Sequence, residues 1–240
     1  HPYILHYKVG VAADGRLTAM EARIIADAGA YASMSPFVTW RSAVQVTGPY
    51  ECPHVHADVY AAYTNNCYTG AMRGFGAPQV NFAIESLMDE LALKLDLDPL
   101  ELRLRNAFEQ GSVTATGQRL DHHTVSIKEV LSRATEAADW SVKRESLNTE
   151  NRSRTDGKRL GIGLACSFRG VSLGAEGVDA AGTIVSIQSD GSVIVHVALT
   201  EMGQGVQSAL SLIAAEVLGI DTQRIKCLGA DTGRVPDSGP

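Results

Sequence analysis

Two glycine-rich segments constrain the fold of this chain more than any other feature of its sequence. The first reads Ala-Met-Arg-Gly-Phe-Gly-Ala-Pro-Gln at residues 71–79, and the second reads Thr-Glu-Met-Gly-Gln-Gly at residues 200–205. Each is followed by apolar residues at helical spacing, so each predicts a glycine loop that leads into a helix. A helix start presents backbone N–H groups and a partial positive charge, which suit an anionic ligand. Two such starts in one chain predict a grip on one large anionic ligand.

Composition and charge narrow the class of protein. The chain has 240 residues, of which 45% are hydrophobic and 20% charged, with a formal net charge of -6. This length allows one large or two small domains, each able to bury a core. The negative charge gives no basis for a nucleic-acid partner or an anionic membrane surface. No apolar run approaches the roughly 20 residues that a membrane span needs, so no membrane partner is predicted.

The cysteines and the chain ends carry two further expectations. Cys52, Cys67, Cys166 and Cys227 form no CxxC pair, so neither a zinc knuckle nor an iron–sulfur cluster is indicated. Sparse, unpatterned cysteines predict buried free thiols in a reducing compartment, and therefore a cytoplasmic location. A start without methionine and an end in loop-like residues 237–240 predict a piece of a larger polypeptide.

The first third of the chain predicts strands. Residues 3–11 and 17–27 have strand composition and flank Ala-Asp-Gly at 13–15, which indicates a hairpin. Residues 55–63 alternate and carry aromatic and branched side chains, so they predict another strand. The small residues of 29–40 predict an irregular loop.

The next part predicts helices. Pro78 stands where a helix can begin, and apolar residues continue from it at helical spacing. Asp98 is a cap for a second helix, and Ser126 with Glu129 forms a capping box for a third that ends near Trp140. The later elements are predicted as a polar linker over 141–159, a strand over 161–168, a hairpin of 183–188 and 192–199, a helix over 206–218 ended by Gly219, and a strand over 225–228.

These elements predict an α+β fold of two lobes, with mixed, largely antiparallel sheets and packed helices, rather than a doubly wound parallel sheet. The first lobe is expected at 1–140, the linker at 141–160 and the second lobe at 161–240.

Several residues in and near the glycine segments are candidates for ligand binding. Gly74 and Gly76, like Gly203 and Gly205, let the backbone approach a ligand closely. Each segment also admits a structural explanation, as a tight helix entry or a strained turn without a ligand. Three side chains extend the set: Phe75 could stack on a flat ring, Gln204 offers an amide, and Arg41 could fix a ligand oxygen or form a surface salt bridge.

Other chemistries find less support. Gly203-x-Gly205-x-x-Ser208 lacks the third glycine of a dinucleotide fingerprint, and the strand before it reads as half of an antiparallel hairpin. His54-x-His56 and the pair His122-His123 have no third plausible metal ligand nearby. No pair of acidic residues stands out as an acid–base couple.

Together the two segments resemble the molybdenum-binding subunit of the xanthine dehydrogenase and aldehyde oxidase family. The resemblance spans nearly the whole chain and includes segments 1–10, 117–120, 190–193 and 235–238. It implies a molybdopterin cofactor and hydroxylation of an aldehyde or an N-heteroaromatic, purine-like substrate with oxygen from water. It also implies partner subunits or domains that carry iron–sulfur centres and FAD, together with the rest of the large subunit.

The resemblance assigns roles residue by residue. Arg73 would lie beside the molybdenum through its backbone N–H, within a cofactor-binding loop that includes Gly74 and Gly76. Gln204, with Gly203 and Gly205, would contact the pterin. The substrate would stack on Phe75 and be oriented by Arg41.

The sequence also departs from the family pattern. The second aromatic of purine-oxidising members falls near Leu173, which puts a purine substrate in doubt, and residues 71–79 differ from the cysteine-bearing loop of carbon monoxide dehydrogenases. The family's earlier glutamine loop and its glutamate base lie outside residues 1–240, so the fragment is predicted to be inactive. A cofactor-free relative that acts as an assembly or interaction module, and a nucleotide-binding dehydrogenase with a parallel βαβ unit around Gly203, are the alternatives.

Overall fold

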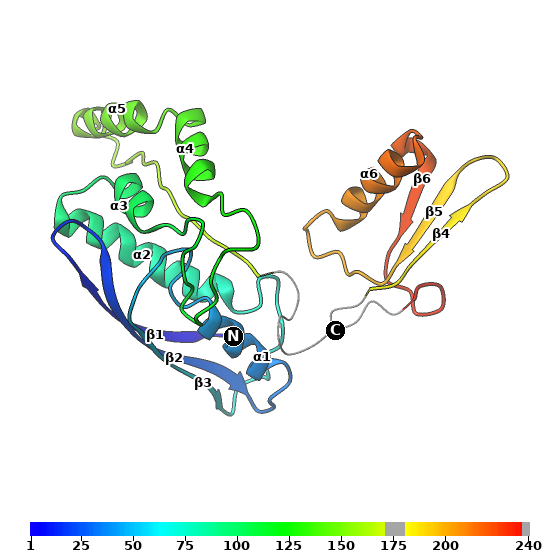
Figure 1. Cartoon of the computed structure of the whole chain (residues 1–240), viewed down its shortest axis with the longest axis horizontal. Coiled ribbons are helices and arrows are strands. Elements are labelled where there is room, and N and C mark those ends of the chain that lie inside the picture. The colour runs from blue at the N-terminus through cyan, green and yellow to red at the C-terminus, as the bar shows by residue number, and fades with distance from the viewer. Residues whose placement is uncertain (171–180, 237–240) are drawn as a thin grey trace. The chain divides into compact units, whose positions relative to one another are not determined.

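A three-stranded sheet with one antiparallel and one parallel strand pair forms the base of the first unit. The computed structural model describes residues 1–170 and 181–236, divided into unit 1, His1–Arg169, and unit 2, Gly170–Pro240. In unit 1, β1 (Tyr3–Val11) and β2 (Leu17–Gly29) form the predicted antiparallel hairpin, and β3 (Val55–Tyr63) pairs with β2 in parallel (Figure 1).

Helices cover this sheet and build the core. The longest, α2, buries Val80, Ile84 and Met88 in one cluster with Ile24 and Met20 of β2. These apolar side chains recur at helical spacing on α2 and at alternate positions on β2, so each element turns one face to the core. The helices of unit 1 are α1 (Ser35–Val44), α2 (Ala77–Leu95), α3 (Pro99–Asn106), α4 (Ile127–Ala137) and α5 (Trp140–Ser153).

Helix α1 replaces part of the loop predicted over 29–40. Pro36 lies in its first turn, where proline is tolerated, and the Thr39 hydroxyl donates to the Ser35 carbonyl at 2.9 Å. Its small, β-branched and polar residues have weak helix propensity, so the sequence did not predict a helix. Tertiary packing stabilises it, because Val38 and Ser42 are buried.

Two helix starts show how far capping can be predicted. Asp98 caps α3 as expected, since its carboxylate accepts from the Leu100 amide at 2.8 Å. Ser126 is the N-cap of α4, but its side chain makes no capping hydrogen bond, so the predicted capping box is not formed. Helix α4 ends at Ala137, and Trp140 begins a separate helix.

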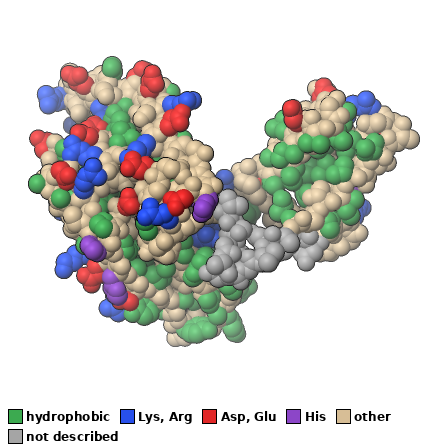
Figure 2. Space-filling model, in the orientation of Figure 1, with side chains coloured by type: hydrophobic (Ala, Val, Ile, Leu, Met, Phe, Trp, Pro, Cys, Tyr) green, Lys and Arg blue, Asp and Glu red, His purple; other side chains and the backbone are tan. Residues whose placement is uncertain are grey.

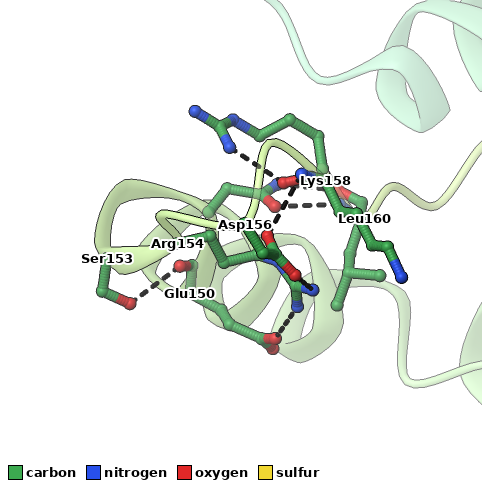
Figure 3. Close-up of polar contacts among 8 residues, drawn as sticks. Glu150, Ser153, Arg154, Asp156, Lys158 and Leu160 are labelled. Carbon is green, nitrogen blue, oxygen red and sulfur yellow. Dashed lines mark hydrogen bonds and ion pairs between the residues drawn. The ribbon is translucent and has the colours of Figure 1, made fainter.

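The predicted linker is largely helical. Helix α5 runs to Ser153, and the turn after it is held by Arg154, which pairs with Glu150 at 2.8 Å and Asp156 at 2.6 Å (Figure 3). The charges interpreted from sequence as a linker are therefore a solvated helix face and its end. Residues 161–168 form no strand, and unit 1 continues beyond them to Arg169.

Unit 2 is a smaller sheet with one long helix. The sheet consists of β4 (Thr183–Ile187), β5 (Val193–Val197) and β6 (Ile225–Leu228), with β4 antiparallel and β6 parallel to β5. Helix α6 (Val206–Leu218) joins β5 to β6 and ends at Gly219, which is left-handed as predicted. The strand before the second glycine segment thus belongs to a parallel βαβ unit as well as to a hairpin, and the sequence pattern did not predict this parallel pairing.

The surface of unit 2 carries an apolar region. Hydrophobic side chains gather over α6 (Figure 2), where Leu212, Ile213 and Val217 are more than half exposed. Within the described ranges, no helix is both long and apolar enough to cross a bilayer.

Candidate cofactor site

The first glycine loop, residues 73–76, has an unusual backbone. Gly74, Phe75 and Gly76 all have positive φ, at 99°, 53° and 91°. Glycine adopts this region freely, whereas a bulky residue there costs about 1–3 kcal/mol and persists only where its surroundings enforce it. Phe75 is held by its amide, which donates to the Met72 carbonyl at 2.7 Å. The loop therefore has one defined course into α2.

Gly76 is required because the loop lies directly against α1. A Cβ at this position would stand 2.3 Å from the Val38 carbonyl oxygen and 2.6 Å from Ser42 Oγ. Ser42 Oγ also lies 3.2 Å from the Gly76 carbonyl and 2.9 Å from the Tyr3 hydroxyl. The start of α2, helix α1 and strand β1 are thus locked together at this point.

The loop leaves backbone donors available. In the described part of the chain, the amides of Arg73, Gly74 and Gly76 have no hydrogen-bond acceptor. Neighbouring amides in a loop with positive φ can bind an anion or an oxygen-rich group. This arrangement is what a close-binding cofactor with many oxygen atoms needs.

A cavity of about 310 Å³ adjoins the same loop. Gln45 stands in its wall and donates to the Phe168 carbonyl at 2.9 Å, yet its buried Oε1 has no partner among the described residues. Because a buried acceptor without a donor costs about 1–3 kcal/mol, this oxygen favours a donor supplied by a ligand or water. Further residues of the wall include Gly48, Gly74, Pro78, Asn81 and Arg169.

Arg41, expected either to bind ligand or to lie on the surface, is buried on α1 with 5% exposure. Its guanidinium carbon lies 4.9 Å from the centroid of the Trp40 ring. A second guanidinium, on Arg169, lies within its electrostatic reach, since burial and then Arg41 lower the pKa of Arg169. No sequence signal singled out Arg169, because a lone arginine in an irregular segment carries no motif.

The second glycine loop, residues 201–205, is closed by its own carboxylate. Glu201 accepts from the amides of Gly203 at 2.7 Å, Gly205 at 3.0 Å and Val206 at 2.8 Å. The Gln204 side chain is used within the loop too, since its Nε2 donates to the Thr200 carbonyl at 2.7 Å. The anion expected at this helix start is thus supplied by the chain itself. A glutamate two residues before the first glycine was the available signal.

The predicted site residues divide between the two units. Unit 1 brings Gly76 against α1, the helix that carries Arg41, and Gln204 lies in unit 2. Leu173, the expected place of a second aromatic, lies outside the described residues. No group of three or more His, Cys, Asp or Glu side chains in the described ranges could hold a metal ion. All four cysteines are free, but Cys67 is exposed rather than buried.

The fold is of the α+β class, and the first glycine loop has backbone amides that suit an oxygen-rich ligand. Comparison with known families identifies the class of cofactor. Residues 1–107 and residues 133–240 each match a family described as a molybdopterin cofactor-binding domain. The chain therefore consists largely of molybdopterin cofactor-binding domains, and it belongs to the xanthine dehydrogenase and aldehyde oxidoreductase family.

Individual relatives agree with this assignment. The chain is 31% identical over 239 residues to the xanthine dehydrogenase molybdenum-binding subunit of Escherichia coli O157:H7, covering 98% of this chain and 31% of the relative. It is 32% identical to the aldehyde oxidoreductase of Megalodesulfovibrio gigas, covering 100% of this chain and 26% of that protein. The crystal structure of quinoline 2-oxidoreductase from Pseudomonas putida 86 superposes with a TM-score of 0.78 at 27% identity, covering 98% of this chain and 31% of that one. The chain thus spans about a third or less of these relatives.

The family match also decides against the nucleotide-binding alternative. That alternative required a parallel βαβ unit around Gly203, and β5, α6 and β6 do form one. The third position of the fingerprint is nevertheless Ser208, and Glu201 already takes up the amides at the helix start. A βαβ unit alone therefore does not identify a dinucleotide site.

Proposed function

We propose that this chain is part of the large subunit of a molybdenum hydroxylase that oxidises an N-heteroaromatic, purine-like substrate or an aldehyde with oxygen from water. The observation that carries the proposal is the first glycine loop, where the amides of Arg73, Gly74 and Gly76 and the buried Gln45 Oε1 have no hydrogen-bond partner among the described residues. This donor and acceptor set suits molybdopterin. When bound, the cofactor supplies the metal-centred redox chemistry of hydroxylation.

The residues of this chain hold and orient rather than transfer protons. The backbone amides of Arg73, Gly74 and Gly76 would bind the cofactor near its metal, and Gln204, with Gly203 and Gly205, stays a predicted contact of the pterin. Phe75 would stack on the substrate ring. Arg41 would fix a substrate oxygen by paired hydrogen bonds, for which its planar, permanently charged guanidinium is suited. No general base is assigned within residues 1–240, so we expect the fragment alone to be inactive.

The cofactor-free alternative would need the space beside the loops to be filled. A cavity of about 310 Å³ adjoins Gly74. This open space supports the cofactor-binding function. The same proposal places iron–sulfur and FAD carriers on partner subunits or other parts of a longer chain. The cytoplasmic location stays a prediction from the cysteine pattern.

The test uses the full protein with its partners, produced in a host that makes the cofactor. After a screen identifies a heteroaromatic or aldehyde substrate, R41M should lower kcat/KM about 100-fold while molybdenum content stays unchanged. R23M is the matched control, because Arg23 also stacks on an aromatic ring, Tyr60, but lies on β2 away from the glycine loop in the chain. Equal activity of R41M and wild type would contradict the substrate role. Substrate oxidation by residues 1–240 alone would overturn the predicted inactivity.

A further inference from the structure

The segment 160–169, which we call the anchored segment, has no regular secondary structure yet is fixed at several points. The Cys166 amide donates to Glu85 Oε2 at 2.9 Å, and the Phe168 carbonyl accepts from Gln45 at 2.9 Å. The Phe168 ring meets the Phe108 ring edge to face, with centroids 5.4 Å apart. Anchors to α2, to the residue after α1 and to Phe108 give this irregular backbone a defined course.

The anchored segment ends on the first glycine loop. Arg169 Nη1 donates a hydrogen bond to the Gly74 carbonyl oxygen, which also accepts from the Ala77 amide at 3.1 Å. The peptide that carries this carbonyl is held on its other edge by the Phe75 amide, which donates to the Met72 carbonyl at 2.7 Å, so Arg169 adds a side-chain contact to a peptide held otherwise by backbone groups. Holding that carbonyl restricts rotation of the peptide between Gly74 and Phe75, and with it the directions of the flanking amides.

The side chain of Arg169 has little other use in the described part of the chain. It forms no ion pair there, and its partial burial beside Arg41 is unfavourable for a cation. A largely exposed hydrogen bond also adds little to global stability. A role at the adjacent loop explains why an arginine stands at this position.

We propose that Arg169 is a positioning residue of the cofactor site, which holds the Gly74 carbonyl so that the amides of Gly74 and Gly76 stay directed at the cofactor. The proposal rests on the proposed molybdopterin function. It concerns a residue that acts through the loop, not one that touches the reacting atoms.

The experiment compares R169Q and R169K with wild type in the full, cofactor-loaded protein. R119Q is the control, because Arg119 also donates to a glycine carbonyl, that of Gly111, at 3.1 Å. For R169Q we expect kcat per bound molybdenum to fall about tenfold with KM changed less than twofold, since a small misplacement of reacting groups is costly. R169K retains a charged donor and should recover most of kcat, and R119Q should match wild type.

A second readout does not depend on activity. Hydrogen exchange of a peptide that covers residues 72–77 should become about tenfold faster in R169Q, while the melting temperature stays unchanged. The proposal would be overturned if R169Q had the same hydrogen exchange and the same kcat as wild type. It would also be overturned if R169Q changed only KM, or if its lower kcat were explained by a lower melting temperature. Wild-type protein without molybdenum or pterin would instead contradict the proposed function, so the two failures are distinguishable.

Discussion

The carboxylate of Glu85 on α2 accepts a hydrogen bond from the backbone amide of Cys166 at 2.9 Å, although the two residues are 81 positions apart. The same carboxylate accepts from the Tyr50 hydroxyl at 2.5 Å and from Arg103 Nε at 2.9 Å. Burial, together with the Glu85 charge, raises the pKa of Tyr50, so this hydroxyl remains a donor. Because α2 begins at the first glycine loop and the anchored segment ends there, Glu85 supports the candidate site from within the core.

Replacing Glu85 should therefore destabilise unit 1 strongly. E85A removes the buried one of the two carboxylates that pair with Arg103, a fully buried guanidinium, and should cost about 3–5 kcal/mol of unfolding free energy. D89N is the matched control, because Asp89 pairs with the same arginine at 2.8 Å but is 58% exposed. D89N should lower the unfolding free energy by about 1 kcal/mol or less. Urea unfolding of both variants checks this, and similar costs would contradict the central role of Glu85.

Gly76 should tolerate no side chain. In G76A, left-handed strain of about 1–2 kcal/mol adds to a clash of about 1–3 kcal/mol, because the Cβ would stand 2.3 Å from the Val38 oxygen. Gly117 has a similar φ of 83° with no atom within 4 Å, so G117A isolates the strain. In thermal unfolding, the melting temperature of G76A should be well below that of G117A. Equal melting temperatures would show that the loop does not pack against α1 as described.

Glu201 should stabilise the start of α6 in a pH-dependent way. Its hydrogen bonds from the amides of Gly205, Gly203 and Val206 lower its pKa. This stabilisation is therefore present above the ordinary glutamate pKa of about 4.3 and is lost as the pH falls through the lower folded value. At neutral pH, E201Q should lower hydrogen-exchange protection of these three amides. E216Q, a change on the exposed face near the end of α6, should not lower this protection. Unchanged protection of the three amides in E201Q would contradict the role of Glu201 at the start of α6.

The cysteines should differ sharply in reactivity. Cys67 is exposed, whereas burial and then the Glu85 charge raise the pKa of Cys166 to about 11. Burial raises the pKa of Cys52 as well. At pH 8 a thiol reagent should label Cys67 first, and C67S should remove this fast phase. Labelling of native Cys166 at the same rate would contradict its burial; denaturation should expose all four thiols equally.

Local chemistry predicted much of the fold. The Asp-Gly turn at 13–15, the proline at the start of α2, the Asp98 cap and Gly219 all act within a few residues, so their effects could be inferred directly. Long-range pairing could not be inferred in this way. The parallel partners of β2 and β5, and the helix α1 made of weak helix formers, depend on packing between distant segments.

In the candidate site, too, local features could be predicted from the sequence and long-range contacts could not. The positive φ of Gly74 and Gly76 could be anticipated because the backbone freedom of glycine can be recognised in the sequence, whereas their contact with a cofactor stays a prediction. Arg169 and Glu85 were missed because their partners lie 95 and 81 residues away. The use of Glu201 as its own loop's anion could have been predicted, since the carboxylate stands two residues from the first glycine, but neither the ligand-binding nor the structural explanation of the loop included it.

The most direct test of the central claim is the molybdenum and pterin content of the full protein, purified with its partners from a host that makes the cofactor. We expect near-stoichiometric molybdenum together with pterin. Absence of both would contradict the cofactor-binding function, and the amides at residues 73–76 would then serve packing or a different ligand.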